Sequence, residues 1–326
     1  MYMQRRTFLR AAGLACASPM VGVRPAWAAA TSLPQGPITV IVPFTAGGST
    51  DTSTRVIMRQ VQENTGLNII VENRPGGGTR IGTDALVRAA PDGRTLALAT
   101  NNLAFNETLY EGKLNYRLDA DIAPVSLTHS TAHTLLVHPA VPANTFEEFI
   151  EYAKQNPGVV TFGSAGIGTT NHLCGEYLKS VAGIDMLHVP YQGISALMPD
   201  LYSGRVLVLF ASLVTALEAA RDKRMKLLAV TTEKRQSQAP DVPAIAEFYP
   251  EYAFSSWIGY MAPGATPKPI VDGLSAEFVK AVKTPGIMEQ IPGFEPLGST
   301  PEAFRSFLKE EVDTSRRIIQ SARIEL

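Results

Sequence analysis

Three short stretches of glycine and hydroxyl residues have the types and spacing to bind an anion. The first is Phe-Thr-Ala-Gly-Gly-Ser-Thr-Asp at 44–51, the second is Ser-Ala-Gly-Ile-Gly-Thr-Thr at 164–170, and the third is Tyr-Gln-Gly at 191–193. Glycine lets the backbone approach a ligand closely. Serine, threonine and aspartate favour the start of a helix, where free amides and the helix dipole attract negative charge. We therefore expect these stretches to bind a small carboxylate without proton transfer.

The candidate ligand-binding residues come from these stretches and from Asn102, which follows a predicted strand. They are Phe44, Thr45, Gly47, Gly48, Ser49, Thr50, Asp51, Asn102, Ser164, Gly166, Gly168, Thr169, Thr170 and Tyr191. Each hydroxyl taken singly has a second interpretation, because it can cap its own helix instead of contacting a ligand. Three interpretations of Asp51 stay open: it caps its helix, it repels a second carboxylate of the ligand, or it accepts an ammonium group.

The same stretches lack the residues of common catalytic and nucleotide-binding motifs. The first has no Gly-Lys-Ser/Thr, which a phosphate-binding P-loop needs, and the second has Asn171 where a dinucleotide fingerprint has its third glycine. Ser164 is not in a nucleophile elbow, because Phe162 stands where that motif has glycine. We predict no catalytic residue, no cofactor and no enzyme. A hydrolase or lyase acting on a carboxylate in the same site is the alternative from the enzyme class.

The histidines and cysteines do not predict a metal site or a disulfide. His129 and His133 are four residues apart, but their neighbours favour strand and loop, so no helix places both rings on one face. Cys174 would be the one cysteine left after removal of an N-terminal export signal. It lies in the apolar pattern of a predicted helix, which favours a buried, unreactive thiol.

Residues 1–28 have the features of an export signal. Arg5-Arg6 is a twin arginine, residues 11–23 are small and apolar, and Ala-Trp-Ala at 26–28 is typical of a cleavage site. We expect export to the periplasm by the twin-arginine route, with cleavage near Ala28. Removing this segment leaves 25 basic and 30 acidic residues, a net charge of −5. A nucleic-acid-binding protein would carry a basic surface instead, so no nucleic-acid partner is expected.

Each of the three stretches follows a predicted strand and precedes a predicted helix. The strands are Ile38–Val42, Val159–Phe162 and Met186–Val189, and strands alternate with helices along the rest of the chain. This alternation predicts an α/β fold with mainly parallel sheets. Ligands of such folds lie beyond the carboxyl ends of the strands, where all three stretches occur.

The mature length favours two lobes rather than one hydrophobic core. Ile122–Leu127 and Thr134–Val137 both favour strand, and we expect the chain to cross into the second lobe between them. The expected first lobe is 29–128 with 254–326, and the expected second lobe is 129–253. A strand at Thr95–Thr100 is expected to end in Asn101-Asn102, and a less regular segment that contains Tyr110 and Tyr116 is expected to follow.

A family resemblance follows from an ordered set of motifs. Pro-Phe-Thr-Ala-Gly-Gly-Ser-Thr-Asp at 43–51 resembles the first-loop signature of the Bug-type periplasmic solute-binding receptors, which are the extracytoplasmic component of tripartite tricarboxylate transporters. Five further motifs are similar to that family in the same order: 71–77 (Val-Glu-Asn-Arg-Pro-Gly-Gly), 91–93 (Pro-Asp-Gly), 163–168, 189–193 (Val-Pro-Tyr-Gln-Gly) and 241–243 (Asp-Val-Pro). Together they cover essentially the whole mature chain.

The resemblance implies a two-lobed "Venus flytrap" of the periplasmic binding protein kind. The chain crosses between the lobes twice, each lobe has a mainly parallel sheet flanked by helices, and the ligand cleft lies between them. The family typically holds the ligand carboxylate with the loops that open the first helix of each lobe, here Phe44–Asp51 and Ser164–Thr170. The partners it implies are a small organic carboxylate and the membrane subunits of a tripartite tricarboxylate system.

One departure from the family pattern concerns Arg80. Thr79-Arg80 stands where the family usually has a glycine and a small polar residue. Arg80 is either a solvated surface residue or a contact to a second anionic group on the ligand. Our overall interpretation is a monomeric, non-enzymatic receptor that closes around its ligand. A sensor that presents the ligand to a membrane regulator remains the alternative from the signalling class.

Overall fold

The computed structural model describes residues 32–321 and residue 324. The predicted export signal at 1–28 lies outside these residues. Ten strands form one mixed sheet in the order β2-β1-β3-β9-β4-β7-β5-β6, and β10 and β8 each pair with β4. Within residues 32–321, none of the helices combines the length and the apolar character that crossing a bilayer needs.

The first lobe is built on β1 (Ile38–Val42), which pairs in parallel with β2 (Ile69–Asn73) and β3 (Thr95–Ala99). Four of the five residues of β1 are buried, as expected for a strand covered on both faces. Two helices pack with these strands, α1 (Ser49–Thr65) and α2 (Arg80–Val87), and α8 (Lys268–Val282) packs with α1 and with β4.

The second lobe repeats this design. Its strand β5 (Val160–Ser164) pairs in parallel with β6 (Met186–Pro190) and β7 (Val208–Ser212), and β8 (Lys226–Val230) pairs with β4. The strands alternate with helices whose bounds are α4 (Phe146–Gln155), α5 (Thr170–Ala182), α6 (Ile194–Tyr202) and α7 (Leu213–Arg221).

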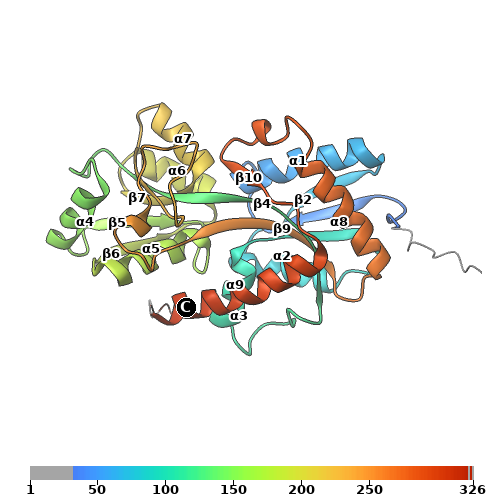
Figure 1. Cartoon of the computed structure of the whole chain (residues 1–326). Helices are drawn as coiled ribbons and strands as arrows, with labels where there is room; N and C mark the ends of the chain where they lie inside the picture. The colour runs from blue at the N-terminus through green and yellow to red at the C-terminus, as the bar shows by residue number, and fades with distance from the viewer. Residues whose placement is uncertain (1–31, 322–323, 325–326) are drawn as a thin grey trace, which may run out of the picture. The chain divides into compact units, whose positions relative to one another are not determined.

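Two strands that lie side by side connect the lobes (Figure 1). β4 runs without a break from Ile122 to Val137, and β9 runs from Ser255 to Pro263. β4 pairs antiparallel with β9 as far as Ala132, and then with β7 from His133 and with β8 from Thr134. The central pairs of the sheet are therefore antiparallel, and the parallel pairs lie outside them. The short β10 (Phe294–Pro296) pairs antiparallel with residues 129–131 of β4.

The prediction of two strands within 122–137 was wrong, because its polar middle is buried inside the sheet. The Thr128 hydroxyl donates to the Ile258 carbonyl at 3.0 Å, and the Thr131 hydroxyl donates to the Gly293 carbonyl at 2.7 Å. These bonds satisfy hydroxyls that in the sequence resemble those of a loop.

A second correction concerns the chain from Asn101 onward, which was predicted to end a strand and then to be less regular. Asn101–Leu109 forms helix α3. It has no polar face, because its first six residues are all buried, and so it lacks the amphipathic period on which sequence prediction depends. The C-terminal helix α9 (Pro301–Ser321) packs against α3. Three short 3₁₀ turns complete the described chain: Gly77–Thr79, Ile245–Glu247 and Met288–Gln290.

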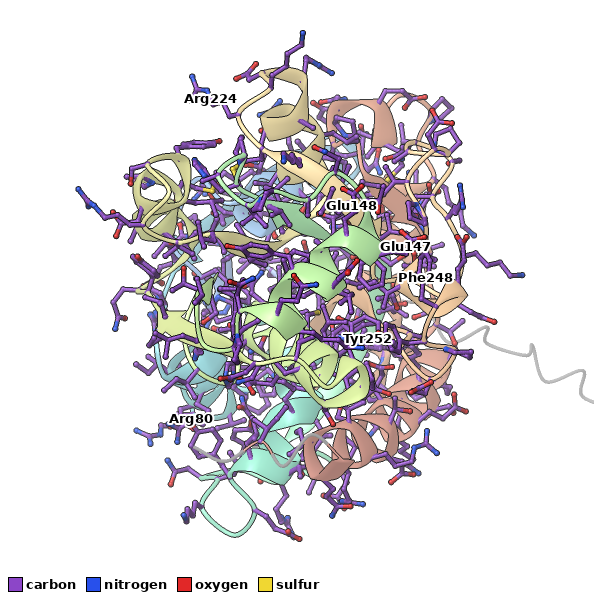
Figure 2. All side chains as sticks on the ribbon, turned by 90° about the vertical axis from the view of Figure 1, so that its left-hand side faces the viewer. Arg80, Glu147, Glu148, Arg224, Phe248 and Tyr252 are labelled. Carbon is purple, nitrogen blue, oxygen red and sulfur yellow. The ribbon has the colours of Figure 1, made fainter. Side chains whose placement is uncertain are left out.

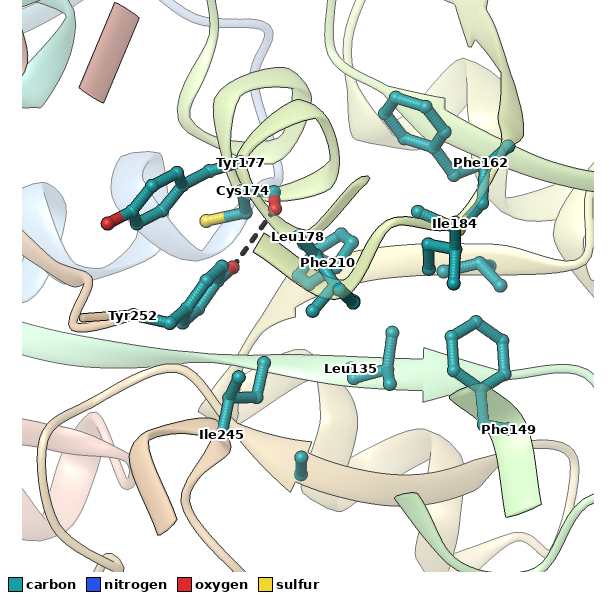
Figure 3. Close-up of a cluster of buried hydrophobic side chains, with 14 of the residues drawn as sticks. Leu135, Phe149, Phe162, Cys174, Tyr177, Leu178, Ile184, Phe210, Ile245 and Tyr252 are labelled. Atoms are coloured by element: carbon teal, nitrogen blue, oxygen red, sulfur yellow. Dashed lines mark hydrogen bonds between the residues drawn. The ribbon is translucent and has the colours of Figure 1, made fainter. Parts of the chain in front are cut away.

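The main core of the second lobe also contains side chains from α3 and α9. Figure 3 shows part of this cluster, with Cys174 and Tyr177 of α5 facing Tyr252. The Tyr252 hydroxyl donates to the Cys174 carbonyl at 3.0 Å. Cys174 is free and fully buried, and burial raises the pKa of its thiol. The predicted burial of this residue is confirmed.

Candidate functional site

A cavity of about 900 Å³ lies where loops of the two lobes meet. The loops from β1 to α1, β5 to α5, β6 to α6 and β7 to α7 all contribute to its wall. All but two of the predicted site residues line it: Phe44, Thr45, Gly47, Gly48, Ser49, Thr50, Asp51, Asn102, Gly166, Thr169, Thr170 and Tyr191. The other two, Ser164 and Gly168, lie behind the wall.

Most helices that begin at this cavity leave their first amides without a side-chain cap. Helix α7 is an exception, because the hydroxyl of its N-cap residue Ser212 accepts from the Thr215 amide at 3.4 Å. The N-cap residues of α1, α3, α5 and α6 are Gly48, Thr100, Thr169 and Gly193, and none of them accepts a capping hydrogen bond on its side chain. By contrast, α4 begins away from the cavity, and its Thr145 accepts a capping bond from an amide at 3.2 Å. Uncapped amides at a helix start are donors that an anion can use.

Asp51 is bound to its own loop. Its carboxylate accepts hydrogen bonds from the Gly47 amide at 3.0 Å, from Asn73 Nδ2 at 2.9 Å and from Arg55 Nε at 3.1 Å. Burial opposes ionisation, but these bonds together hold the pKa of the carboxyl below its usual value. Asn73 Nδ2 also donates to the Phe44 carbonyl at 3.0 Å. The 44–51 loop is thus fastened to the end of β2 and to its own helix.

Asn73 and Arg55 support the loop, and neither was predicted from the sequence as a site residue. Asn73 begins the Asn-Arg-Pro motif that contributed to the family resemblance, and Arg55 stands four residues after Asp51. The contact of Arg55 with Asp51 could have been predicted, because acidic and basic residues four apart meet on one face of a helix. The contact of Asn73 could not, because it depends on the register of β2 against β1, in which Asn73 lies opposite Val42.

Ser164 supports the second loop from behind. Its hydroxyl donates to the Gly166 carbonyl at 3.0 Å, accepts from the Gly166 amide at 3.1 Å, and lies 2.7 Å from His188 Nε2. Its side chain is fully buried. The pair of serine and histidine therefore holds the loop in shape, and Ser164 is not presented to the cavity.

Two histidines that the sequence argument missed complete this support. His172 Nδ1 accepts from the Gly168 amide at 3.2 Å, and the rings of His172 and His188 have centroids 4.1 Å apart. Burial lowers the pKa of each imidazole to about 4, so both are neutral at pH 7. Neutral imidazole can accept the Gly168 amide bond, whereas the protonated form cannot.

Several contacts join the lobes around the cavity. Asn102 Nδ2 donates to the Gly168 carbonyl at 2.7 Å, and the Ser212 hydroxyl donates to the Ser49 hydroxyl at 3.2 Å. A Cβ atom at Gly193 would lie 2.6 Å from Thr45 Oγ1, so these two loops touch. The amide nitrogen of Asn102 therefore reaches across to the other lobe.

The aromatic and basic residues near the cavity have protein partners. The Tyr191 hydroxyl donates to Asp200 Oδ2 at 2.7 Å, which fixes the tyrosine at the wall. Arg80 lies near the edge of the view in Figure 2. Its Nε donates to the Gly77 carbonyl at 2.9 Å, and its guanidinium lies 3.6 Å from the centre of the Tyr110 ring. Tyr110 lines the cavity and Arg80 does not.

The positive potential at the cavity comes from backbone amides at helix starts rather than from basic side chains. Among the described residues that line it, none is lysine or arginine, and the acidic ones are Asp51 and Glu218. Within the same part of the chain, no three histidine, cysteine or carboxylate residues are grouped so as to hold a metal ion. The arrangement can bind an anion through amides and hydroxyls.

The family model for the tripartite tricarboxylate transporter family receptor matches residues 53–324. A curated relative from Pseudomonas sp. (strain P51), a UPF0065 protein from the tcbD-tcbE intergenic region, is 34% identical over 90% of this chain and 88% of its own. The structure of the periplasmic binding protein BugD has a TM-score of 0.84 and 31% identity, covering 90% of this chain and 99% of its own. The structure of the R. palustris protein Rpa4515 with adipate has a TM-score of 0.85 and 28% identity, and the match covers 90% of this chain and 99% of Rpa4515. The fold is that of periplasmic binding proteins, and the chain belongs to the tripartite tricarboxylate transporter receptor family, whose members are solute-binding receptors and not enzymes.

Proposed function

We propose that this protein captures a small organic carboxylate in the cavity and delivers it to a tripartite tricarboxylate-type transporter. The observation that carries the proposal is the set of uncapped helix starts at the cavity, those of α1, α3, α5 and α6. Among the described residues that line this cavity, none is lysine or arginine. Each helix start has roughly half a positive elementary charge and several free amides. A carboxylate satisfies those amides, whereas an uncharged ligand gains nothing from the field.

The residues that bind the carboxylate belong to the loops at α1 and α5. We propose that amides of the 47–51 and 166–170 segments contact it, together with the hydroxyls of Ser49 and Thr170, which line the cavity. Asp51 and Ser164 act as supports of these loops rather than as ligand contacts, since their side chains are already bonded within them. The adipate bound to Rpa4515 supports a carboxylate as the class of ligand.

Opening and closing of the lobes gives the ligand access. We propose lobe boundaries at 128/129 and 253/254, so that the hinge lies in β4 and in the segment just before β9. Hinges of this kind are a few residues that absorb the backbone change. The contacts of Asn102 with Gly168 and of Ser49 with Ser212 would form only when the lobes close.

A calorimetric titration of the mature protein tests the binding proposal. Aliphatic carboxylates of two to eight carbons would be compared with their primary amides, which have nearly the same shape without the charge. Several carboxylates are expected to bind, and the amides at least tenfold more weakly, since hydrogen bonds to a charged group contribute about 1.5–3 kcal/mol. If uncharged amides or sugars bind and no carboxylate does, the anion argument is wrong.

Localisation and partners need separate experiments. We propose periplasmic export through the twin-arginine route, with cleavage near Ala28, and a monomeric mature protein. Replacing Arg5 and Arg6 by lysine should retain the protein in the cytoplasm, and light scattering should give the mass of one chain. Ligand-dependent co-purification with transporter membrane subunits would support transport, whereas co-purification with a membrane kinase would favour the sensor alternative.

A further inference from the structure

Helix α6 forms one wall of the cavity, and this wall is mainly apolar. Its cavity residues are Ile194, Ser195, Met198 and Tyr202. Ile194, Met198 and Tyr202 are spaced four residues apart, so they lie on one face of the helix and form what we call the α6 stripe. The first two are partly buried and Tyr202 is 37% exposed, so the stripe has apolar surface that a ligand can cover.

The α6 stripe begins beside the two loops proposed to hold the carboxylate. Gly193 directly precedes the stripe, and a Cβ atom there would lie 2.6 Å from Thr45 Oγ1 of the first loop. The Tyr191 carbonyl is close to the second loop, 3.6 Å from where a Cβ atom of Gly166 would lie. Because an α-helix rises 1.5 Å per residue, the stripe then extends about 12 Å away from these loops.

Helix α7 also begins at the carboxylate loops and provides a second wall. The hydroxyl of its N-cap residue Ser212 donates to the Ser49 hydroxyl at 3.2 Å. Within the helix, the cavity residues are Val214, Thr215 and Glu218. Val214 and Glu218 are one turn apart on the same face, so Glu218 lies about 6 Å farther along the helix from the loops. The Glu218 carboxylate thus belongs to the far end of the cavity.

Glu218 also differs from Asp51, the other acidic residue at the cavity, in having no partner. Within residues 32–321, no group donates a hydrogen bond to the Glu218 carboxylate or forms an ion pair with it. The guanidinium of Arg224 lies 5.0 Å from the centre of the Tyr202 ring, but Arg224 does not line the cavity, and its Nε lies 3.8 Å from Asp222. A second carboxylate at this end of a ligand would therefore meet an uncompensated negative charge.

We propose that the ligand is a monocarboxylate with a bulky apolar body, such as a phenyl ring, and that the α6 stripe and Glu218 select it over dicarboxylates. This inference rests on the proposed function, because it takes the carboxylate to be held at α1 and α5. The apolar body gains affinity by covering the stripe, and Glu218 repels a second carboxylate. The cavity of about 900 Å³ is also in the range that takes ligands much larger than succinate.

Calorimetry of the mature wild-type protein with three related ligands tests the proposal. The ligands are butanoate, 4-phenylbutanoate, and 4-phenylbutanoate with a second carboxylate at the para position. The phenyl ring should tighten binding at least tenfold over butanoate, because it covers apolar surface. The para carboxylate should then weaken binding about tenfold or more, because it meets Glu218 and loses water against an apolar wall. For the same reasons hexanoate should bind more tightly than adipate.

Two substitutions separate the roles of the two walls. Met198→Gln keeps the length of the side chain and makes it polar, so it should reduce the preference for the phenyl ring about fivefold or more. Glu218→Gln removes the charge, so it should reduce the penalty of the para carboxylate about threefold or more. Leu187→Gln on β6 and Glu147→Gln on α4 are the controls, because they make the same changes at exposed positions outside the cavity. Neither control should alter these ratios.

The proposal is overturned if the wild type binds adipate more tightly than hexanoate, or if the phenyl ring does not tighten binding. These two comparisons do not depend on how any variant folds. It is also wrong if Met198→Gln leaves the phenyl preference unchanged, or if Glu218→Gln leaves the penalty of the para carboxylate unchanged. In each of these cases, binding of any carboxylate leaves the proposed function standing, whereas binding of none refutes both.

Discussion

Asp51→Asn distinguishes the three roles that the sequence left open for this residue. The substitution keeps the shape of the side chain and removes its charge. The structure shows three donors on the carboxylate, from Gly47, Asn73 and Arg55. Asparagine can still accept a bond on its one carbonyl oxygen, but it places an amide group where the second oxygen accepted. The 44–51 loop should then loosen.

The expected loss follows from the burial of the carboxylate. Its side chain is 4% exposed, while that of Arg55 is 45% exposed, so the ion pair itself contributes little. Losing charge-assisted bonds from the Gly47 amide and Asn73 should cost about 1–3 kcal/mol of unfolding free energy. For a chain of this size that is a fall in melting temperature of roughly 2–10 °C. Asp92→Asn is the control, because Asp92 makes comparable bonds with Arg94 on the surface and should change little.

Urea unfolding and calorimetry of both variants provide the test. Because the pKa of Asp51 is lower in the folded state than its usual value of 3.8, its stabilisation is present above about pH 4 and disappears as pH falls through the folded pKa. The difference between wild type and Asp51→Asn should shrink accordingly at low pH. Affinity should fall for all carboxylates by a similar factor. Tighter carboxylate binding would refute this account and show that Asp51 repels the ligand, while a loss confined to amino acids would show an ammonium contact.

Three further substitutions, together with one control at Lys223, separate folding from binding. Gly48→Val should abolish carboxylate binding and leave the melting temperature nearly unchanged, since a Cβ there meets its nearest neighbour only at 3.9 Å; normal affinity would remove this turn from the site. Thr79→Gly should stabilise the fold by about 1 kcal/mol, because a β-branched residue is strained at φ 78°, and it should alter ligand affinity because Thr79 lines the cavity. Lys223→Gly, at φ 55°, is the control and should only stabilise the fold. Equal ligand affinities in the two variants would show that the strain at the cavity serves no ligand. Asn102→Ala should weaken every carboxylate about five- to tenfold through loss of its bond to Gly168, and a loss that differs between ligands would point to direct contact instead.

The local design of the site could be predicted from the sequence. A buried β-branched run and the hydroxyl residues after the glycine turn at 38–51 predict a strand and a helix start, and both are observed. The same pattern at 159–170 predicted the second loop. These predictions succeeded because each depends on neighbouring residues and on the period of one element.

What the sequence could not predict depends on contacts between distant residues. Ser164 was a candidate ligand contact, but its hydroxyl bonds His188, which lies on the next strand of the sheet. Asn102 follows β3 and bonds Gly168 in the other lobe, which no local pattern indicates. The continuous β4 was missed because tertiary hydrogen bonds satisfy its polar residues. In each case the partner is more than twenty residues away.

The central claim is that helix-start amides, and not basic side chains, hold the ligand. A crystal structure of the mature protein with a bound carboxylate tests it most directly. We predict that the oxygens of one carboxylate lie within hydrogen-bond distance of amides at the starts of α1 and α5, with no lysine or arginine nitrogen in contact. A carboxylate paired with an arginine such as Arg80, or bound outside this cavity, would contradict the account.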